Sequence, residues 1–192
     1  MDEFLHWKKQ SLGKLDKSPK SSIDERVKLL CDVINQRDDM FSLSSCSGRV
    51  CLLEISDEGK KDSNWLIVSH DLADFLDFYK NFDSYNGEKR IYFKQESCIM
   101  HICVKNIDIA KELIHIARES GFNHAGIISL RKITVELICD VSISTLIYDK
   151  KKLIDEGYMK VLIKEGNKNQ KLSWSAIEKL KNKITKLTYN EY

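Results

Sequence analysis

Residues 41–55, FSLSSCSGRVCLLEI, contain two apolar stretches separated by a run of small polar side chains. The apolar stretches are typical of strands, and residues 44–49 between them predict a loop that is tethered on both sides. Small side chains let backbone N–H groups approach a ligand, Gly48 takes positive φ at little cost, and Arg49 offers a planar fork for phosphate or carboxylate. Taken alone, this chemistry favours a plain polar turn, because Ser and Gly are ordinary turn formers.

Hydrophobic spacing predicts helices on both sides of this stretch. The clearest helix begins at a capping box of Ser22 and Glu25 and ends near Asn35, with apolar residues recurring at one-face spacing. Another begins after Asn106 and ends at Gly121. Further helices are expected at residues 1–15, 71–82, 152–164 and 173–187, and strands at residues 41–44, 50–55, 65–68, 90–93, 99–104, 127–130, 133–139 and 143–148.

This order of elements mixes hairpins with crossovers, which predicts an α+β fold with a mixed or antiparallel sheet packed with helices. A chain of 192 residues with 42% hydrophobic content buries one sizeable core. The sequence contains a single proline, and no Ser/Gly-rich linker interrupts the chain. We therefore expect one domain over residues 1–192. No G-x-G-x-x-G follows a predicted strand, so a Rossmann-type sheet is not supported.

The longest uncharged apolar stretches fall far below the roughly 18 residues of a membrane span, and the N-terminus lacks a secretory pattern, so an intracellular protein is expected. The six cysteines include no C-x-x-C pair, and no histidine spacing suggests a metal site. Buried free thiols are the favoured interpretation, and one structural disulfide is the alternative.

The positive charge of the chain is concentrated at its C-terminal end. From Lys150 onward there are eleven Lys or Arg against five Asp or Glu, although the whole chain carries only +2. These lysines either attract an RNA backbone in a salt-dependent way or form an ordinary solvated helix face.

Four stretches of the chain carry a set of motifs: residues 15–25 (LDKSPKSSIDE), residues 44–49 (SSCSGR), Glu96 with His101, and Gly121 and Phe122 with Gly126 and Ile127. In order and spacing they resemble the tRNA wybutosine-synthesising protein 3 family, whose patterns read approximately L-D-K-S-x-K-G-S-I-D-E, S-S-C-S-G-R, E-P-F-x-L-H-V and G-F-R-x-S-G-I. The resemblance runs from about Leu15 to Asn167. It implies a cytoplasmic enzyme that transfers a methyl group from S-adenosylmethionine to a ring nitrogen of a wybutosine precursor beside the anticodon of phenylalanine tRNA. It implies no DNA or membrane partner, and the oligomeric state stays open.

The resemblance also suggests which residues form the site. Candidate catalytic residues are Ser45, His101 and Asp24, and candidate cofactor-binding residues are Ser47, Gly48, Arg49 and Lys17. Three of them have structural alternatives. Asp24 lies in a first helical turn, where the helix dipole favours a carboxylate, Lys17 suits a surface ion pair, and a strand histidine such as His101 is usually a satisfied core residue.

The chain departs from the family patterns at several positions, and two expected polar contacts are missing. The departures are Ser21, Ser97, Cys98, Asn123, Ala125 and Ile138. They leave open whether this is a divergent active enzyme or a noncatalytic RNA-binding or scaffold protein of the same fold. A small-molecule binder without RNA is a third interpretation.

The tryptophan side chains have two possible roles. They either stack on bases or pack in the core, and core packing is favoured for Trp7, Trp65 and Trp174.

Overall fold

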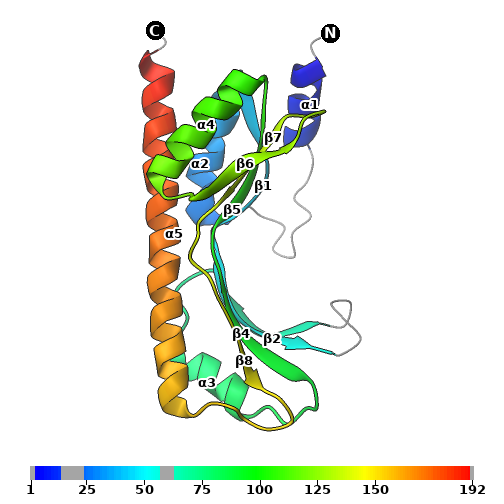
Figure 1. Cartoon of the computed structure of the whole chain (residues 1–192), viewed down its shortest axis with the longest axis vertical. Coiled ribbons are helices and arrows are strands. Elements are labelled where there is room, and N and C mark those ends of the chain that lie inside the picture. Colours follow the sequence, from blue (N-terminus) through cyan, green and yellow to red (C-terminus); the bar gives the residue numbers. More distant parts are fainter. Residues whose placement is uncertain (1–2, 14–23, 57–62, 191–192) are drawn as a thin grey trace. The chain divides into compact units, whose positions relative to one another are not determined.

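The protein is described by a computed structural model that covers residues 3–13, 24–56 and 63–190. It divides into two compact units, the first made of residues 1–47, 98–140 and 173–192 and the second of residues 48–97 and 141–172. Each unit holds a four-stranded antiparallel sheet with helices packed on it (Figure 1). The predicted α+β class is thus confirmed, and a single domain over residues 1–192 stays a prediction.

The sheet of the first unit, called sheet A, has the strand order β1-β5-β7-β6, and all its neighbours are antiparallel. Its strands are β1 (Met40–Cys46), β5 (Ile99–Val104), β6 (His124–Ser129) and β7 (Thr134–Ile138). The helices within this unit are α1 (Glu3–Leu12), α2 (Glu25–Gln36) and α4 (Ile107–Ser120).

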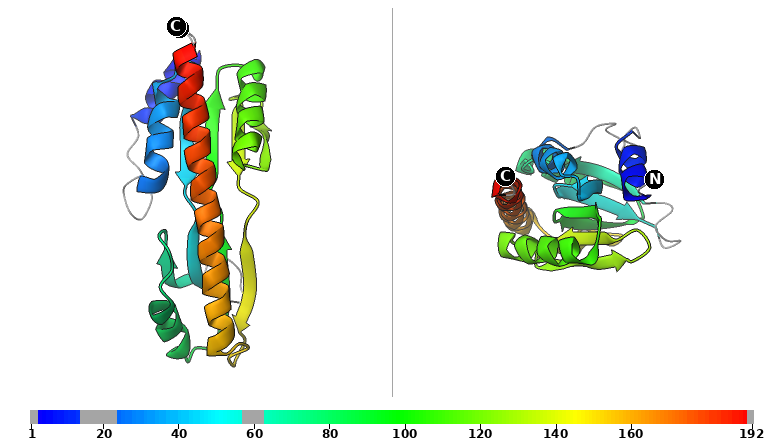
Figure 2. Two further views of the ribbon diagram at one scale, coloured as in Figure 1. Left: turned by 90° about the vertical axis from the view of Figure 1, so that its left-hand side faces the viewer. Right: turned by 90° about the horizontal axis from the view of Figure 1, so that it is seen from above.

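Helices α1 and α2 lie on opposite faces of sheet A (Figure 2). Phe41 of β1 packs against Phe4 of α1 in a small buried cluster. The next residue, Ser42, donates its backbone N–H to the side-chain oxygen of Asn35 in α2 at 2.8 Å. Successive strand residues point to opposite faces, so these two contacts assign one face of sheet A to each helix.

The sheet of the second unit, called sheet B, has the order β3-β2-β4-β8, again antiparallel throughout. Its strands are β2 (Arg49–Ile55), β3 (Asn64–Ser69), β4 (Arg90–Glu96) and β8 (Ile143–Tyr148), and its short helix is α3 (Phe75–Asp83). Val50, Leu52, Ile91 and Phe93 form a buried core with residues of α3 and of the C-terminal helix. This core lies on one face of sheet B, since these positions alternate along β2 and β4.

The C-terminal segment forms one helix, α5 (Glu156–Asn190), so the prediction of two separate helices is wrong. The sequence pattern favours a break near Gly166, Asn167 and Asn169, which are poor helix formers. Tertiary contacts in the second unit outweigh that propensity. A Cβ at Gly166 would lie 3.2 Å from the Phe93 ring, so the glycine permits close packing, and Asn167 bonds to both backbone groups of Ala73.

The helix starts and ends were predicted with mixed success. Asn106 caps α4 and Gly121 ends it with φ of 111°, both as predicted. Helix α2 has Asp24 as its N-cap, and the predicted cap Ser22 lies outside the described residues. Helix α3 begins only after Asp74, whose side chain accepts from the Asp77 N–H, so its predicted start at residue 71 is wrong.

All six cysteines are free thiols, and five of them are buried, which confirms the favoured interpretation. Within the described ranges, no helix is long and apolar enough to cross a membrane. The same residues contain no group of three or more His, Cys, Asp or Glu side chains that could hold a metal ion.

Replacing Asn167 with alanine should lower the free energy of unfolding by about 2 kcal/mol, because two hydrogen bonds to Ala73 are lost and both backbone groups are left unpaired. Urea unfolding followed by circular dichroism measures the change. Asn182→Ala, an exposed position on the same helix, is the matched control and should stay within about 0.5 kcal/mol of the parent. Equal midpoints for the two variants would contradict the role given to Asn167.

Iodoacetamide at pH 8 should modify Cys46 before the other five cysteines, because Cys46 is the partly exposed thiol among the six. Burial raises the pKa of Cys51 to about 11 and that of Cys103 to about 11, so both stay protonated and unreactive at this pH. Mass spectrometry of tryptic peptides gives the order of modification. Labelling of Cys51 as fast as Cys46 in the folded protein would contradict this expectation.

Candidate functional site

The serine-rich run is mostly strand. Ser44, Ser45 and Cys46 belong to β1 and pair with residues of β5, so only Ser47 and Gly48 connect β1 to β2. The predicted loop over residues 44–49 is therefore wrong in extent. Backbone pairing with β5 satisfies the main-chain groups of these residues, and that outweighs their preference for turns.

A chain of hydrogen bonds runs across one face of sheet A through His101. The Ser44 Oγ lies 2.7 Å from His101 Nδ1, and the Glu136 carboxylate lies 2.9 Å from His101 Nε2. The three residues are direct register partners on β1, β5 and β7. His101 shares this face with Cys103, which packs against α1, yet its side chain remains 27% exposed. A serine, a histidine and a carboxylate in this order can move a proton between solvent and the imidazole.

Ser45 lies on the opposite face of sheet A from His101. Its register partner Met100 is fully buried, and its hydroxyl accepts a weak hydrogen bond from the Cys31 thiol of α2 at 3.5 Å. Burial raises the pKa of Cys31, so this thiol is a neutral donor. The structure therefore brings Ser44 to His101, and it does not bring Ser45 there.

Asp24 and Ser47 meet at the start of α2. The Ser47 hydroxyl donates to one carboxylate oxygen of Asp24, and the other oxygen accepts the Arg26 N–H at 3.3 Å. Ser47 is fully buried, although it is one of the two residues that connect β1 to β2. Asp24 thus caps the helix and fixes the end of β1 at the same time, and the sequence motif alone could show neither contact.

Arg49 opens β2 in the second unit and has two partners there. Its Nε donates to the Glu96 carboxylate at 2.5 Å, and its guanidinium lies 4.4 Å from the centre of the Trp65 ring. The side chains of Arg49 and Glu96 are 27% and 40% exposed, so solvent reaches both charges. A guanidinium and a carboxylate side by side can receive the two charged ends of a zwitterion.

Gly48 has a packing requirement of its own. Its φ is 100°, and a Cβ there would lie 2.8 Å from the Glu96 carbonyl oxygen and 2.9 Å from the Gln170 side-chain oxygen. Gln170 is fully buried and donates its amide to the His70 carbonyl at 3.2 Å, while its own oxygen finds no partner among the described residues. Glycine is therefore needed at residue 48 both for its backbone angle and for close packing.

Sequence reasoning missed Ser44 as the contact of His101 and missed Glu136 completely. Glu136 reaches His101 only because β7 pairs with β5 in this register, and no local motif encodes that pairing. The opposite case is Lys17, a candidate that lies outside the described residues. The His101 cluster belongs to the first unit and the Arg49 cluster to the second, and the chain passes from one unit to the other between Ser47 and Gly48.

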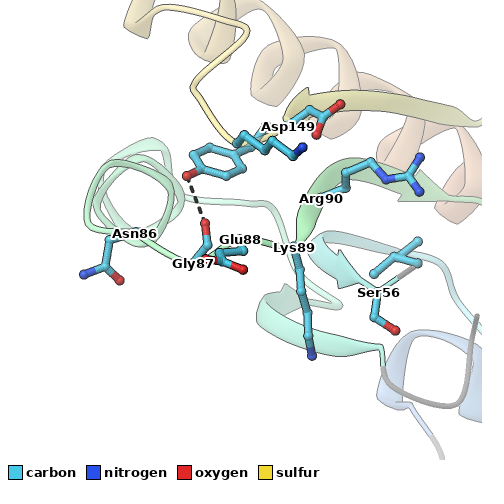
Figure 3. A pocket seen from close by; sticks show the side chains of 10 residues that line it. Ser56, Asn86, Gly87, Glu88, Lys89, Arg90 and Asp149 are labelled. Atoms are coloured by element: carbon cyan, nitrogen blue, oxygen red, sulfur yellow. Dashed lines mark hydrogen bonds between the residues drawn. The ribbon is translucent and has the colours of Figure 1, made fainter. Parts of the chain in front are cut away.

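The second unit also contains an open pocket of about 700 Å³. Residues 55–56, 86–90 and 148–150 line it, and the Tyr148 hydroxyl donates to the Gly87 carbonyl at 3.0 Å across its wall (Figure 3). Lys89, Arg90 and Lys150 outnumber the two acidic residues of the lining. The pocket therefore favours an anionic group.

Comparison with known proteins gives consistent relationships. The family model described as "Methyltransferase TYW3" matches residues 6–186. A tRNA wybutosine-synthesizing protein 3 homolog of Danio rerio is 35% identical over 66% of this chain and 51% of its own length. A protein of Methanocaldococcus jannaschii, named as a tRNA(Phe) 7-((3-amino-3-carboxypropyl)-4-demethylwyosine(37)-N(4))-methyltransferase, is 29% identical over 96% of this chain and 98% of its own.

A solved structure of a Pyrococcus horikoshii protein supports the fold, with a TM-score of 0.87 at 24% identity over 94% of this chain and 95% of that one. The human homolog is 36% identical over 65% of this chain and 49% of its own length. This chain thus spans about half the length of the Danio rerio and human relatives.

Replacing Asp24 with asparagine should leave the stability nearly unchanged, because asparagine caps a helix about as well as aspartate and its amide N–H can donate to the Ser47 hydroxyl, which then accepts. Asp24→Ala should lower the free energy of unfolding by about 1 kcal/mol, since the Arg26 N–H and the Ser47 hydroxyl both lose their acceptor. Urea unfolding of the three proteins measures this. A loss with asparagine as large as with alanine would show that the negative charge, and not the cap, stabilises the helix start.

Proposed function

The chain belongs to the methyltransferase TYW3 family, and we propose that it transfers a methyl group from S-adenosylmethionine to N4 of a 4-demethylwyosine base at position 37 of phenylalanine tRNA. The match of the family model to residues 6–186 is the observation that carries this proposal. The archaeal methyltransferase aligned over 96% of the chain supports the same base and position. We place the reaction in the cytoplasm.

The residues present fit the methionine end of the methyl donor. When bound, S-adenosylmethionine supplies a methyl carbon made electrophilic by its sulfonium. The exposed Arg49 guanidinium suits the carboxylate of the donor, and the adjacent Glu96 carboxylate suits its ammonium group. The Gln170 oxygen beside Gly48, for which the described residues offer no hydrogen-bond donor, adds a buried acceptor in the same unit. Gly48 keeps its proposed place in the cofactor site because it leads directly into Arg49 in the same unit. Ser47 and Lys17 keep theirs through the family motif alone.

His101 is the proposed proton acceptor, and it acts through Ser44. A ring nitrogen that gains a methyl group gives up a proton, and methyl transfer needs little beyond alignment and a place for that proton. Glu136 accepts the Nε2–H of His101 in the tautomer that leaves Nδ1 free to accept from Ser44. The exposed Ser44 hydroxyl then takes the substrate proton as it passes its own to Nδ1.

Asp24 and Ser45 are proposed to hold β1 in place. Asp24 holds Ser47, and Ser45 anchors β1 to α2 through Cys31. Both contacts fix the strand that carries Ser44. These residues are therefore positioning residues for the proposed reaction, although the family resemblance placed them among the catalytic ones.

A noncatalytic RNA-binding or scaffold protein of the same fold is the second candidate. The departures at Asn123, Ala125 and Ile138 favour it, because they replace polar family residues around β6 and β7. In this alternative the chain binds RNA without any dependence on the methyl donor. Arg49→Ala separates the candidates, since it should weaken the binding of S-adenosylmethionine only if the chain is an enzyme.

The test of the proposed function is methyl transfer from labelled S-adenosylmethionine to phenylalanine tRNA that carries the precursor base. His101→Ala should lower kcat by about 100-fold or more, because the proton acceptor is lost. Ser44→Ala should lower kcat while Ser45→Ala affects it much less, because the two serines lie on opposite faces of sheet A. No transfer by the unmutated protein, together with no calorimetric binding of the methyl donor, would overturn the proposal in favour of the noncatalytic alternative.

A further inference from the structure

Sheet B has one face that neither α3 nor α5 covers (Figure 1). Val50 and Leu52 point into the core of the second unit, so Arg49 and Leu53 of the same strand point away from it. The register partners of these residues on β3, β4 and β8 lie on the same side of the sheet. The outer face of sheet B is defined here by Arg49, Leu53, Trp65, Tyr92, Lys94 and Leu146.

We propose that the outer face of sheet B is an RNA-binding platform on which unpaired bases of the tRNA anticodon loop stack, with Trp65 as the principal stacking surface. The proposal rests on the proposed function for the identity of the RNA. Aromatic and guanidinium planes on an open sheet are a common means of holding splayed-out bases.

Trp65 carries most of the argument. The residue is 41% exposed and lies outside the hydrophobic core of its unit. Leu53 is its register partner, and Tyr92 and Leu146 continue the same row across β4 and β8. The Arg49 guanidinium at 4.4 Å adds a second flat group to the indole, so a base can stack on either.

The charges on this face complement a phosphate backbone. Arg49 is paired with Glu96, so these two charges offset each other, and Lys94 leaves the three residues with one net positive charge. Cys51 lies between Arg49 and Leu53 on this side of β2 and has Lys94 as its register partner. It is 1% exposed, so the positive charge of Lys94 lies beside a covered part of the strand.

The outer face leads into the pocket of the second unit. Ile55 and Arg90 form the last register pair of β2 and β4, and both line that pocket (Figure 3). The seven residues of β2 span roughly 23 Å at about 3.3 Å each. That length suits several consecutive nucleotides, with phosphates near Arg90 and Lys150, whereas one adenosyl group would cover only part of it.

The test measures the affinity of the full chain for an unmodified anticodon stem-loop RNA by fluorescence anisotropy. Trp65→Ala should weaken binding by about tenfold, and Trp65→Phe should recover most of the loss because phenylalanine still stacks. Lys94→Ala should reduce the slope of log affinity against log salt by about 0.7, the value for one phosphate contact on a single strand. Leu76→Ala, at a 72% exposed position on α3, is the matched control and should bind like the parent.

Circular dichroism first establishes that each variant folds. Wild-type affinity in Trp65→Ala overturns the platform and leaves the proposed function standing. Trp65→Ala is also titrated with S-adenosylmethionine in the absence of RNA. If this variant binds the methyl donor about tenfold more weakly but binds RNA normally, the adenine of the methyl donor occupies this face, and the platform is overturned. If the unmutated chain transfers no methyl group but binds RNA through Trp65, the proposed function fails and the platform stands. Absence of RNA binding by the unmutated chain overturns both.

Discussion

The burial of one face along α5 is the constraint on which both units depend. Its first half supplies Met159, Leu162 and Ile163 to the core beneath sheet B. In its second half, Ala176 and Ile177 are buried, and a Cβ at Gly121 would lie 3.3 Å from Ala176, so the end of α4 packs directly on this helix. Contacts in the second unit hold the middle of this helix, because Gly166 packs against the Phe93 ring and Asn167 bonds to both backbone groups of Ala73. They are the physical reason why Gly166 and Asn167 stay helical.

The elements that were predicted well are those whose signal is local. The cap at Asn106, the stop at Gly121 and the strand alternation around His101 depend on a few neighbouring residues, and all were found as expected. The continuous α5 and the strand state of Ser44 and Ser45 depend on partners far away in sequence. Helix and turn propensities amount to a few tenths of a kcal/mol per residue, so packing and strand pairing decide these cases.

In the candidate site, too, the sequence indicates individual residues, but it does not indicate their contacts with residues that are distant in sequence. A motif can indicate that Asp24, His101 and Arg49 matter, and the structure gives them specific neighbours in Ser47, Glu136 and Glu96. Which serine reaches the histidine could not be read from the sequence, because the two candidates differ by one position in a strand and so point to opposite faces. The exposure of Trp65 was equally hidden, since core packing was the favoured interpretation for all three tryptophans.

The two units are interleaved along the chain, and this affects how the protein is made. The first unit draws on residues 1–47, 98–140 and 173–192, so its sheet cannot be completed until β7, which ends at Ile138, has been synthesised. Pairings between such distant segments slow folding and leave strand edges open for longer. Because α5 follows every strand of both sheets along the chain, both cores close only after α5 has been translated. A ribosome-stalled or prematurely terminated chain would therefore expose two unfinished hydrophobic cores at once and would be a ready substrate for chaperones and proteases.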